Sequence, residues 1–109
     1  MKRLFALTLL SLAALTATAA EGDIVITIEN HAFSPKEVKI PANKKARLLV
    51  VNKDATPAEF ESKVLGREKV IAGKSSAIIL LGALRPGRYP FVEEYHENDP
   101  GAQGTIIAE

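Results

Sequence analysis

The chain has 109 residues, with 14 basic and 13 acidic side chains and a formal net charge of +1. This near-neutral charge, without any basic run, argues against a nucleic-acid-binding protein. The chain contains no cysteine. Disulfides, zinc–thiolate sites, iron–sulfur clusters and a cysteine nucleophile are therefore excluded.

Residues 1–20 are typical of a secretory signal peptide. Lys2 and Arg3 precede an apolar run from Leu4 to Leu15, and Ala17-Thr18-Ala19 supplies small residues for cleavage. The run is shorter than the about 20 residues that a transmembrane helix needs. A retained signal anchor is the alternative interpretation.

Residues 21–109 are therefore expected to form one secreted domain in the periplasm. Without Lys2 and Arg3, this domain carries 12 basic and 13 acidic residues, a net charge of −1. No second apolar stretch approaches about 18 residues, so the domain is not expected to span a membrane. Met1 is the only methionine and leaves with the signal peptide.

The domain consists of short apolar runs separated by turn residues. In residues 23–30, Ile24, Ile26 and Ile28 alternate with more polar positions, which predicts a strand with one apolar face. Further strands are predicted over residues 37–40, 46–52, 76–81, 89–95 and 103–108. Residues 59–63 and 68–71 also fit short strands, with a helical turn over 62–67 as the alternative. Seven or eight strands at spacings of about 8–12 residues predict an all-β fold, an antiparallel sandwich or barrel.

The candidate functional residues lie in two acidic segments. On a strand, Glu59 and Glu61 share one face; farther along the chain, Glu94 and His96 would share another, with Glu93 three residues before His96. Glu68 stands alone between the two segments. Imidazole with several carboxylates suits iron, Cu(II), manganese or zinc. The alternative is that these side chains are simply solvated.

His31 follows the first predicted strand. It could be an additional metal ligand, but a histidine on a surface loop is the interpretation that the sequence favours.

Three segments carry a family resemblance. Phe33-Ser34-Pro35 near the start, the corner at residues 50–57 and Leu84-Arg85-Pro86-Gly87-Arg88-Tyr89 near the end occur in the order typical of a cupredoxin domain. The chain thus resembles the cupredoxins, which implies a Greek-key antiparallel β-sandwich. Tyr89, two residues after Gly87 of the Pro-Gly turn, is expected to make a hydroxyl bond that stabilises the corner.

The resemblance fails at the copper ligands. Ala58 stands where a blue-copper protein has its first histidine, and Glu93 stands where it has its cysteine. His96 matches the second histidine, and the axial methionine has no counterpart. Because a blue-copper site depends on a copper–thiolate bond, blue-copper electron transfer is excluded.

The acidic segments resemble instead the EfeO-type subgroup of cupredoxin-like proteins. The matching segments are Glu59-Phe60-Glu61-Ser62, Arg67-Glu68-Lys69 and Glu94-Tyr95-His96. The resemblance implies a periplasmic protein that accompanies an inner-membrane ferrous-iron permease and its associated periplasmic proteins. It also implies an iron site, with or without copper, made by Glu59, Glu68, Glu94 and His96, with Glu61 and Glu93 as further candidates.

Three functions remain open at this level. The first is binding and oxidation of Fe(II), as an oxidoreductase component of ferroxidase type. The second is a non-catalytic carrier of copper or another divalent metal. The third is a metal-free docking subunit.

Overall fold

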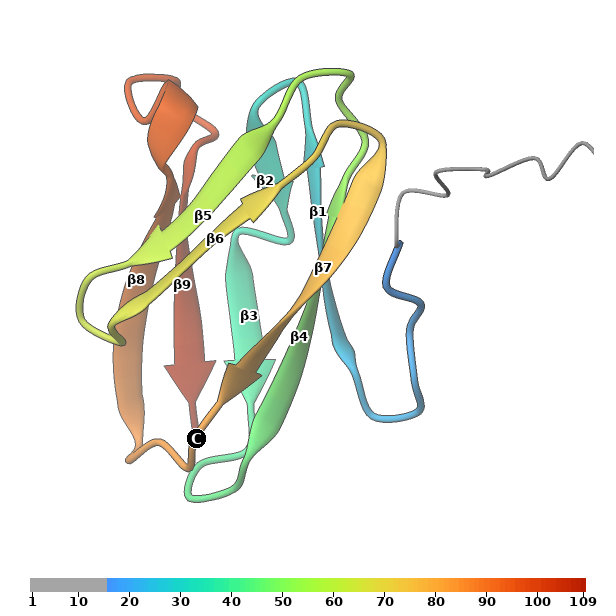
Figure 1. Cartoon of the computed structure of the whole chain (residues 1–109). Helices are drawn as coiled ribbons and strands as arrows, with labels where there is room; N and C mark the ends of the chain where they lie inside the picture. The colour runs from blue at the N-terminus through green and yellow to red at the C-terminus, as the bar shows by residue number, and fades with distance from the viewer. Residues whose placement is uncertain (1–15) are drawn as a thin grey trace, which may run out of the picture.

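The computed structural model describes residues 16–109, so most of the predicted signal peptide, residues 1–20, lies outside the described part. Two β-sheets pack face to face (Figure 1). In spatial order, the first sheet contains β2 (Ala32–Ser34), β1 (Ile24–Glu29), β4 (Ala46–Asn52) and β7 (Ser75–Leu81). The second contains β3 (Glu37–Ile40), β9 (Gln103–Ala108), β8 (Gly87–Glu93), β5 (Ala58–Ser62) and β6 (Arg67–Ile71). The predicted all-β sandwich is confirmed.

The strand details refine the prediction in three places. The described residues form nine strands, because Ala32–Ser34, where the sequence suggested only a chain break, pairs with β1 as a short edge strand. Within the mainly antiparallel sandwich, β1 pairs with β4 and β3 pairs with β9 in parallel. Residues 62–67 hold no helical turn, since β5 and β6 form a hairpin.

The core lies between the two sheets and follows the period-2 pattern of the strands. Ile26 and Ile28 on β1 are completely buried, as their alternation predicted. Phe33, Phe60 and Phe91 meet at the centre, where the Phe60 and Phe91 rings stack with centroids 4.9 Å apart. Phe33 meets the Phe91 ring edge-on at 4.7 Å, a favourable aromatic geometry.

Two corners close the sandwich. The Tyr89 hydroxyl donates to the carbonyl oxygen of Arg85 at 2.7 Å, which confirms the predicted corner bond. At the other corner, the buried Asn52 amide donates to the carbonyl oxygens of Thr56 at 2.8 Å and Ile71 at 3.2 Å. Its Oδ1 accepts the backbone N–H of Asp54 at 3.1 Å, so this one side chain shapes the loop from β4 to β5.

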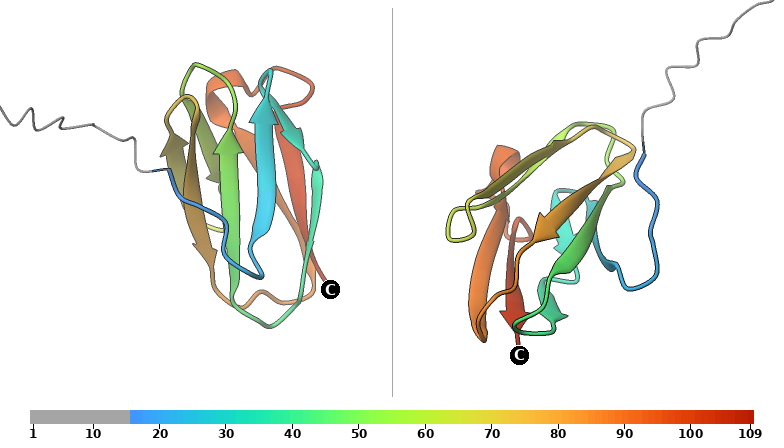
Figure 2. Two further views of the ribbon diagram at one scale, coloured as in Figure 1. Left: turned by 90° about the vertical axis from the view of Figure 1, so that its right-hand side faces the viewer. Right: turned by 60° about the horizontal axis from the view of Figure 1, so that its bottom comes forward.

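Three connecting segments gather at the end of the sandwich opposite the C-terminus: the β1–β2 turn, the β4–β5 loop and a 3-10 helix, η1 (Glu94–His96). They lie at the top in Figure 1 and in the left view of Figure 2. Within residues 16–109, no helix is long and apolar enough to cross a membrane. His31 lies in the β1–β2 turn, and Glu94 and His96 belong to η1, so three of the candidate ligands lie at this end.

Candidate metal centre

Four carboxylates converge where the β5–β6 hairpin meets η1. They belong to Glu59 and Glu61 on β5, Glu68 on β6 and Glu94 at the start of η1. One oxygen from each lies within 4.8 Å of the others. Glu59 and Glu61 share the face away from the Phe60 core side, as their strand alternation predicted, and Glu61 is directly opposite Glu68 in the ladder. We call these four residues the carboxylate cluster.

Glu59 is the most buried member of the carboxylate cluster. Only 7% of its surface is exposed, and its Oε1 has no hydrogen-bond partner among the described residues. A buried carboxylate oxygen without a donor is costly unless a cation or a proton compensates it. The Glu59 side chain is therefore poised for a positively charged partner.

Two members of the carboxylate cluster, Glu59 and Glu61, have raised pKa values. The neighbouring Glu68 carboxyl is the largest cause of the raised pKa of Glu59; Glu94 acts in the opposite direction, and burial of Glu59 adds to the rise. The Glu94 carboxyl likewise raises the pKa of Glu61. The Tyr95 hydroxyl beside them has a raised pKa because of partial burial and then of the negative charge of Glu59. Such mutual repulsion is relieved by a bound cation.

We expect the stability of the metal-free protein to depend less on pH in Glu61→Gln than in the wild type. A carboxyl whose pKa is raised on folding binds its proton more tightly in the folded state. The contribution of Glu61 to the free energy of unfolding is therefore greatest below the ordinary pKa of 4.5. This contribution falls as the pH rises through 4.5 towards the raised pKa. Removing this group should raise the thermal midpoint at about pH 7 and change it little at about pH 4.

Thermal unfolding of the metal-stripped protein at both pH values measures this effect. Glu29→Gln is the matched control, because Glu29 is an exposed glutamate outside the cluster. If the thermal midpoints at the two pH values differ by as much in Glu61→Gln as in the wild type, the argument from repulsion between carboxylates is contradicted.

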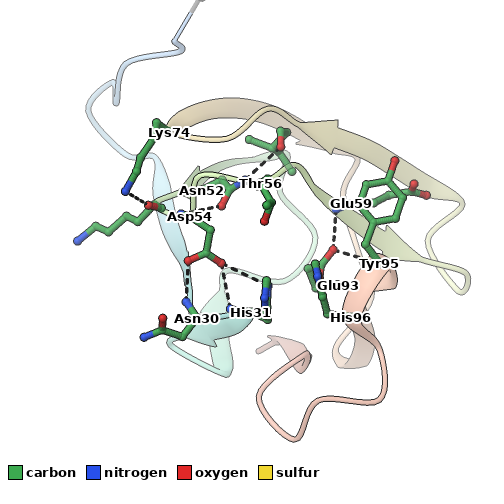
Figure 3. Close-up of polar contacts among 12 residues, drawn as sticks. Asn30, His31, Asn52, Asp54, Thr56, Glu59, Lys74, Glu93, Tyr95 and His96 are labelled. Carbon is green, nitrogen blue, oxygen red and sulfur yellow. Dashed lines mark hydrogen bonds and ion pairs between the residues drawn. The ribbon is translucent and has the colours of Figure 1, made fainter.

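A second group of possible ligands contains Glu93, His96 and His31. Glu93 is completely buried. Its Oε1 accepts the backbone N–H groups of Glu59 at 2.8 Å and Tyr95 at 3.2 Å, and its Oε2 lies 2.5 Å from Nδ1 of His96 (Figure 3). One carboxylate thereby ties the chain at Glu59, the start of η1 and the His96 ring together.

The six sequence-predicted ligands therefore do not form a single site. Glu59, Glu61, Glu68 and Glu94 come together, whereas Glu93 and His96 belong to the second group. The expectation that Glu94 and His96 share a strand face is wrong, because β8 ends at Glu93 and residues 94–96 form a 3-10 helix. With three residues per turn, a 3-10 conformation brings residues i and i+3 together, so Glu93 meets His96 while Glu94 points to the cluster.

His31 joins the second group, although sequence reasoning favoured a surface loop. Its ring stacks on that of His96, with centroids 3.5 Å apart and an interplanar angle of 16°. Its Nδ1 lies 3.5 Å from Oδ2 of Asp54. The one feature of the sequence that could have indicated this pairing is its composition, because His31 and His96 are the only two histidines of the chain.

Comparisons with known proteins agree with this architecture. A family described as "Cupredoxin-like domain" matches residues 2–108. An uncharacterized protein of Rickettsia prowazekii (strain Madrid E) is 41% identical over 85 residues. The matched region covers 78% of this chain but only 66% of that relative, so the chain spans just under two thirds of its length.

Several solved structures have a similar fold. Amicyanin from Paracoccus versutus has 18% identity and a TM-score of 0.65, over 84% of this chain and 85% of that one. Auracyanin from Roseiflexus castenholzii has 18% identity and a TM-score of 0.66, over 84% and 99%. The metal-binding domain of a Cu(I)-exporting P-type ATPase from Streptococcus pneumoniae, solved with Cu(I), has 15% identity and a TM-score of 0.67, over 86% and 93%. At these identities the likeness extends to the fold alone.

The residues present do not fit a blue-copper ion. The position of its cysteine is taken by the buried Glu93, whose carboxylate is already occupied by two backbone N–H groups and His96. Ala58, in place of the first histidine, is a buried core residue without a ligand atom. Among the described residues, the groups placed to hold a metal ion at this end of the sandwich are carboxylates and imidazoles.

Proposed function

Because the chain belongs to the cupredoxin-like domain family but lacks the cysteine of a blue-copper site, we propose that it is a periplasmic metal-binding protein whose carboxylate cluster holds iron. We propose further that it serves an inner-membrane ferrous-iron permease. The proposal rests above all on one observation: Glu59 places a buried, unpartnered carboxylate oxygen among three other carboxylates.

The chemistry of the cluster favours iron over softer ions. Carboxylate oxygens are hard ligands, which suit ions such as manganese and iron, whereas thiolate and thioether ligands select Cu(I). A cation would supply the missing partner of Glu59 Oε1 and would relieve the repulsion between Glu61 and Glu94. Binding energy is therefore available from groups that the folded protein already holds together.

The same cluster would favour oxidation of the bound iron. Anionic oxygen ligands stabilise Fe(III) more than Fe(II), because the higher charge gains more from them. Loss of one electron from Fe(II) requires an acceptor of one electron, and Cu(II), which becomes Cu(I), is an acceptor of suitable class. In this proposal the iron is the transported ion. The carboxylates bind it and favour its Fe(III) state over its Fe(II) state.

Access to the cluster is open on one side. A pocket of about 320 Å³ is lined by Glu61, Glu94 and Glu97, by Lys63 and Val64 of the β5–β6 turn, and by apolar residues of β8. Glu94 and Glu68 are exposed while Glu59 is buried. An ion could thus meet the exposed carboxylates first and the buried one last.

Glu59→Gln is expected to weaken Fe(II) binding at least tenfold, about 1.4 kcal/mol, since the amide keeps the shape but loses the charge. Anaerobic isothermal titration of the purified, metal-stripped protein with Fe(II) measures the affinity. Glu29→Gln, which removes an exposed charge elsewhere, should bind as the wild type does.

The titration also separates the alternatives. Binding followed by Fe(III) formation on addition of Cu(II) or air supports oxidation, and tight binding without turnover supports a carrier. If the wild type binds no Fe(II), or Glu59→Gln binds it unchanged, iron binding at the cluster is refuted. The domain would then be better regarded as a docking subunit.

A further inference from the structure

Tyr95 lies at the carboxylate cluster, and the packing of the sandwich does not explain its position. The chain has two tyrosines and no tryptophan. Tyr89 makes the corner bond to Arg85 at the opposite end of the sandwich, whereas Tyr95 belongs to η1 and is 51% exposed. Its ring takes no part in the contacts between aromatic rings that are found among residues 16–109. Its phenol group is therefore available for another purpose.

One buried carboxylate places Tyr95 beside Glu59. Oε1 of Glu93 accepts the backbone N–H of Glu59 at 2.8 Å and the backbone N–H of Tyr95 at 3.2 Å. The two residues, one on β5 and one in η1, thus share a single acceptor, and Figure 3 shows the Tyr95 ring next to Glu59. Because Glu93 is completely buried, the folded scaffold fixes the backbone at both positions.

The hydroxyl of Tyr95 is directed at the acidic groups. Partial burial is the largest cause of its raised pKa, and the negative charges of Glu59, Glu94 and Glu93 add to the rise. The hydroxyl in turn favours the ionised form of Glu59, acting against the rise in the pKa of Glu59 that Glu68 chiefly causes. Tyr95 is therefore a neutral phenol beside the cluster until a cation displaces its proton.

A phenol that loses its proton becomes a hard, anionic oxygen ligand. A bound cation reverses the effect of the surrounding carboxylates on the phenol, because the cation is then the largest local charge. The attraction between a metal ion and an anionic oxygen grows with the charge of the ion. Fe(III) therefore displaces the phenol proton more readily than Fe(II) or another divalent ion does.

We propose that Tyr95 is a further ligand of the iron site, which binds Fe(III), but not Fe(II), through its phenolate oxygen next to Glu59. The O–H bond of Tyr95 breaks, an Fe–O bond forms, and the proton leaves to water on the exposed side of the ring. This inference rests on the proposed function, because it assigns one more ligand to the same site. The buried Oε1 of Glu59, which has no partner among the described residues, marks that site as more than an acidic surface.

Visible absorption and resonance Raman spectroscopy of the full chain with ferric citrate test this ligand. An Fe(III)–phenolate bond gives a charge-transfer band in the visible range and enhanced ring vibrations of the phenolate, neither of which carboxylate ligands produce. The wild type should show both signals, and Tyr95→Phe should show neither. Tyr89→Phe is the matched control, because it removes the only other phenol of the chain and should keep both signals.

Two affinities of Tyr95→Phe separate this ligand from the iron site itself. Phenylalanine keeps the ring and leaves all four carboxylates in place, so anaerobic titration should show Fe(II) binding as tight as in the wild type. Competition with citrate should show Fe(III) binding that is at least tenfold weaker, about 1.4 kcal/mol. Fe(III) affinity equal to that of the wild type would overturn the proposal.

The outcomes distinguish a failure of this inference from a failure of the proposed function. If the wild type binds Fe(II) but ferric citrate gives no charge-transfer band, or if Tyr95→Phe keeps the band, Tyr95 is not a ligand and the carboxylate site stands. A wild type that binds neither Fe(II) nor Fe(III) refutes the iron site and the assignment of Tyr95 with it.

Discussion

Glu93→Ala is expected to lower the free energy of unfolding by about 3 kcal/mol or more. The substitution leaves the backbone N–H groups of Glu59 and Tyr95 and the Nδ1–H of His96 without their acceptor. Each buried donor left without a partner costs about 1–3 kcal/mol, and the lost side-chain volume adds a cavity. Urea unfolding followed by circular dichroism measures the change.

Glu93→Gln and Glu94→Ala are the matched controls for this prediction. Glutamine keeps the volume and one accepting oxygen for the N–H groups, so it should lose less stability than alanine. Its amide nitrogen would face Nδ1 of His96, which then has to accept, and the hydrogen of the ring should move to Nε2. Nitrogen NMR of the His96 ring detects this change of tautomer. Glu94→Ala removes an exposed neighbour and should cost little. A loss below about 1 kcal/mol in Glu93→Ala would contradict the structural role of the buried carboxylate.

Gly73→Ala is expected to destabilise the protein by about 1–3 kcal/mol, the usual cost of forcing additional atoms into a packed site. A Cβ at Gly73 would lie 2.0 Å from the carbonyl oxygen of Ala55, and this backbone cannot move away as a flexible side chain could. Ala55 adjoins Asp54, whose carboxylate holds Asn30 and His31. A displaced β4–β5 loop should therefore also disturb the ring contact between His31 and His96.

Gly82→Ala is the natural comparison, since nothing lies within 4 Å of a Cβ added there and its backbone is not left-handed. Urea unfolding gives the stability of both variants, and nuclear Overhauser contacts between the two imidazoles report on the stack. Equal stability of Gly73→Ala and Gly82→Ala would contradict the close packing of the two turns.

Several features could be predicted from the sequence because they depend on local pattern. Alternating apolar residues such as Ile26 and Ile28 predicted a strand with one buried face, and both are buried. The same alternation placed Glu59 and Glu61 on one face of a strand. The Pro-Gly turn before Tyr89 predicted the corner bond to Arg85. In each case, neighbours within a few residues determine the outcome.

The absence of cysteine was equally decisive at the level of sequence. It excludes a blue-copper site by ligand chemistry, whatever the fold. The match to the cupredoxin-like family and the similar folds of amicyanin and auracyanin do not alter that conclusion. The sequence therefore predicted the β-sandwich and also excluded blue-copper electron transfer.

Only the tertiary structure decided how the candidate ligands are divided. A strand and a 3-10 turn direct Glu94 and His96 differently, and the choice depends on where β8 ends, at Glu93. The burial of Glu93 and the placement of His31 depend on contacts between segments far apart in the chain. His31 meets His96 because the packed sheets and Asp54 bring two distant turns to the same end of the sandwich. No local pattern encodes such long-range packing, which is why the sequence indicated one mixed site and the folded chain has two separate groups.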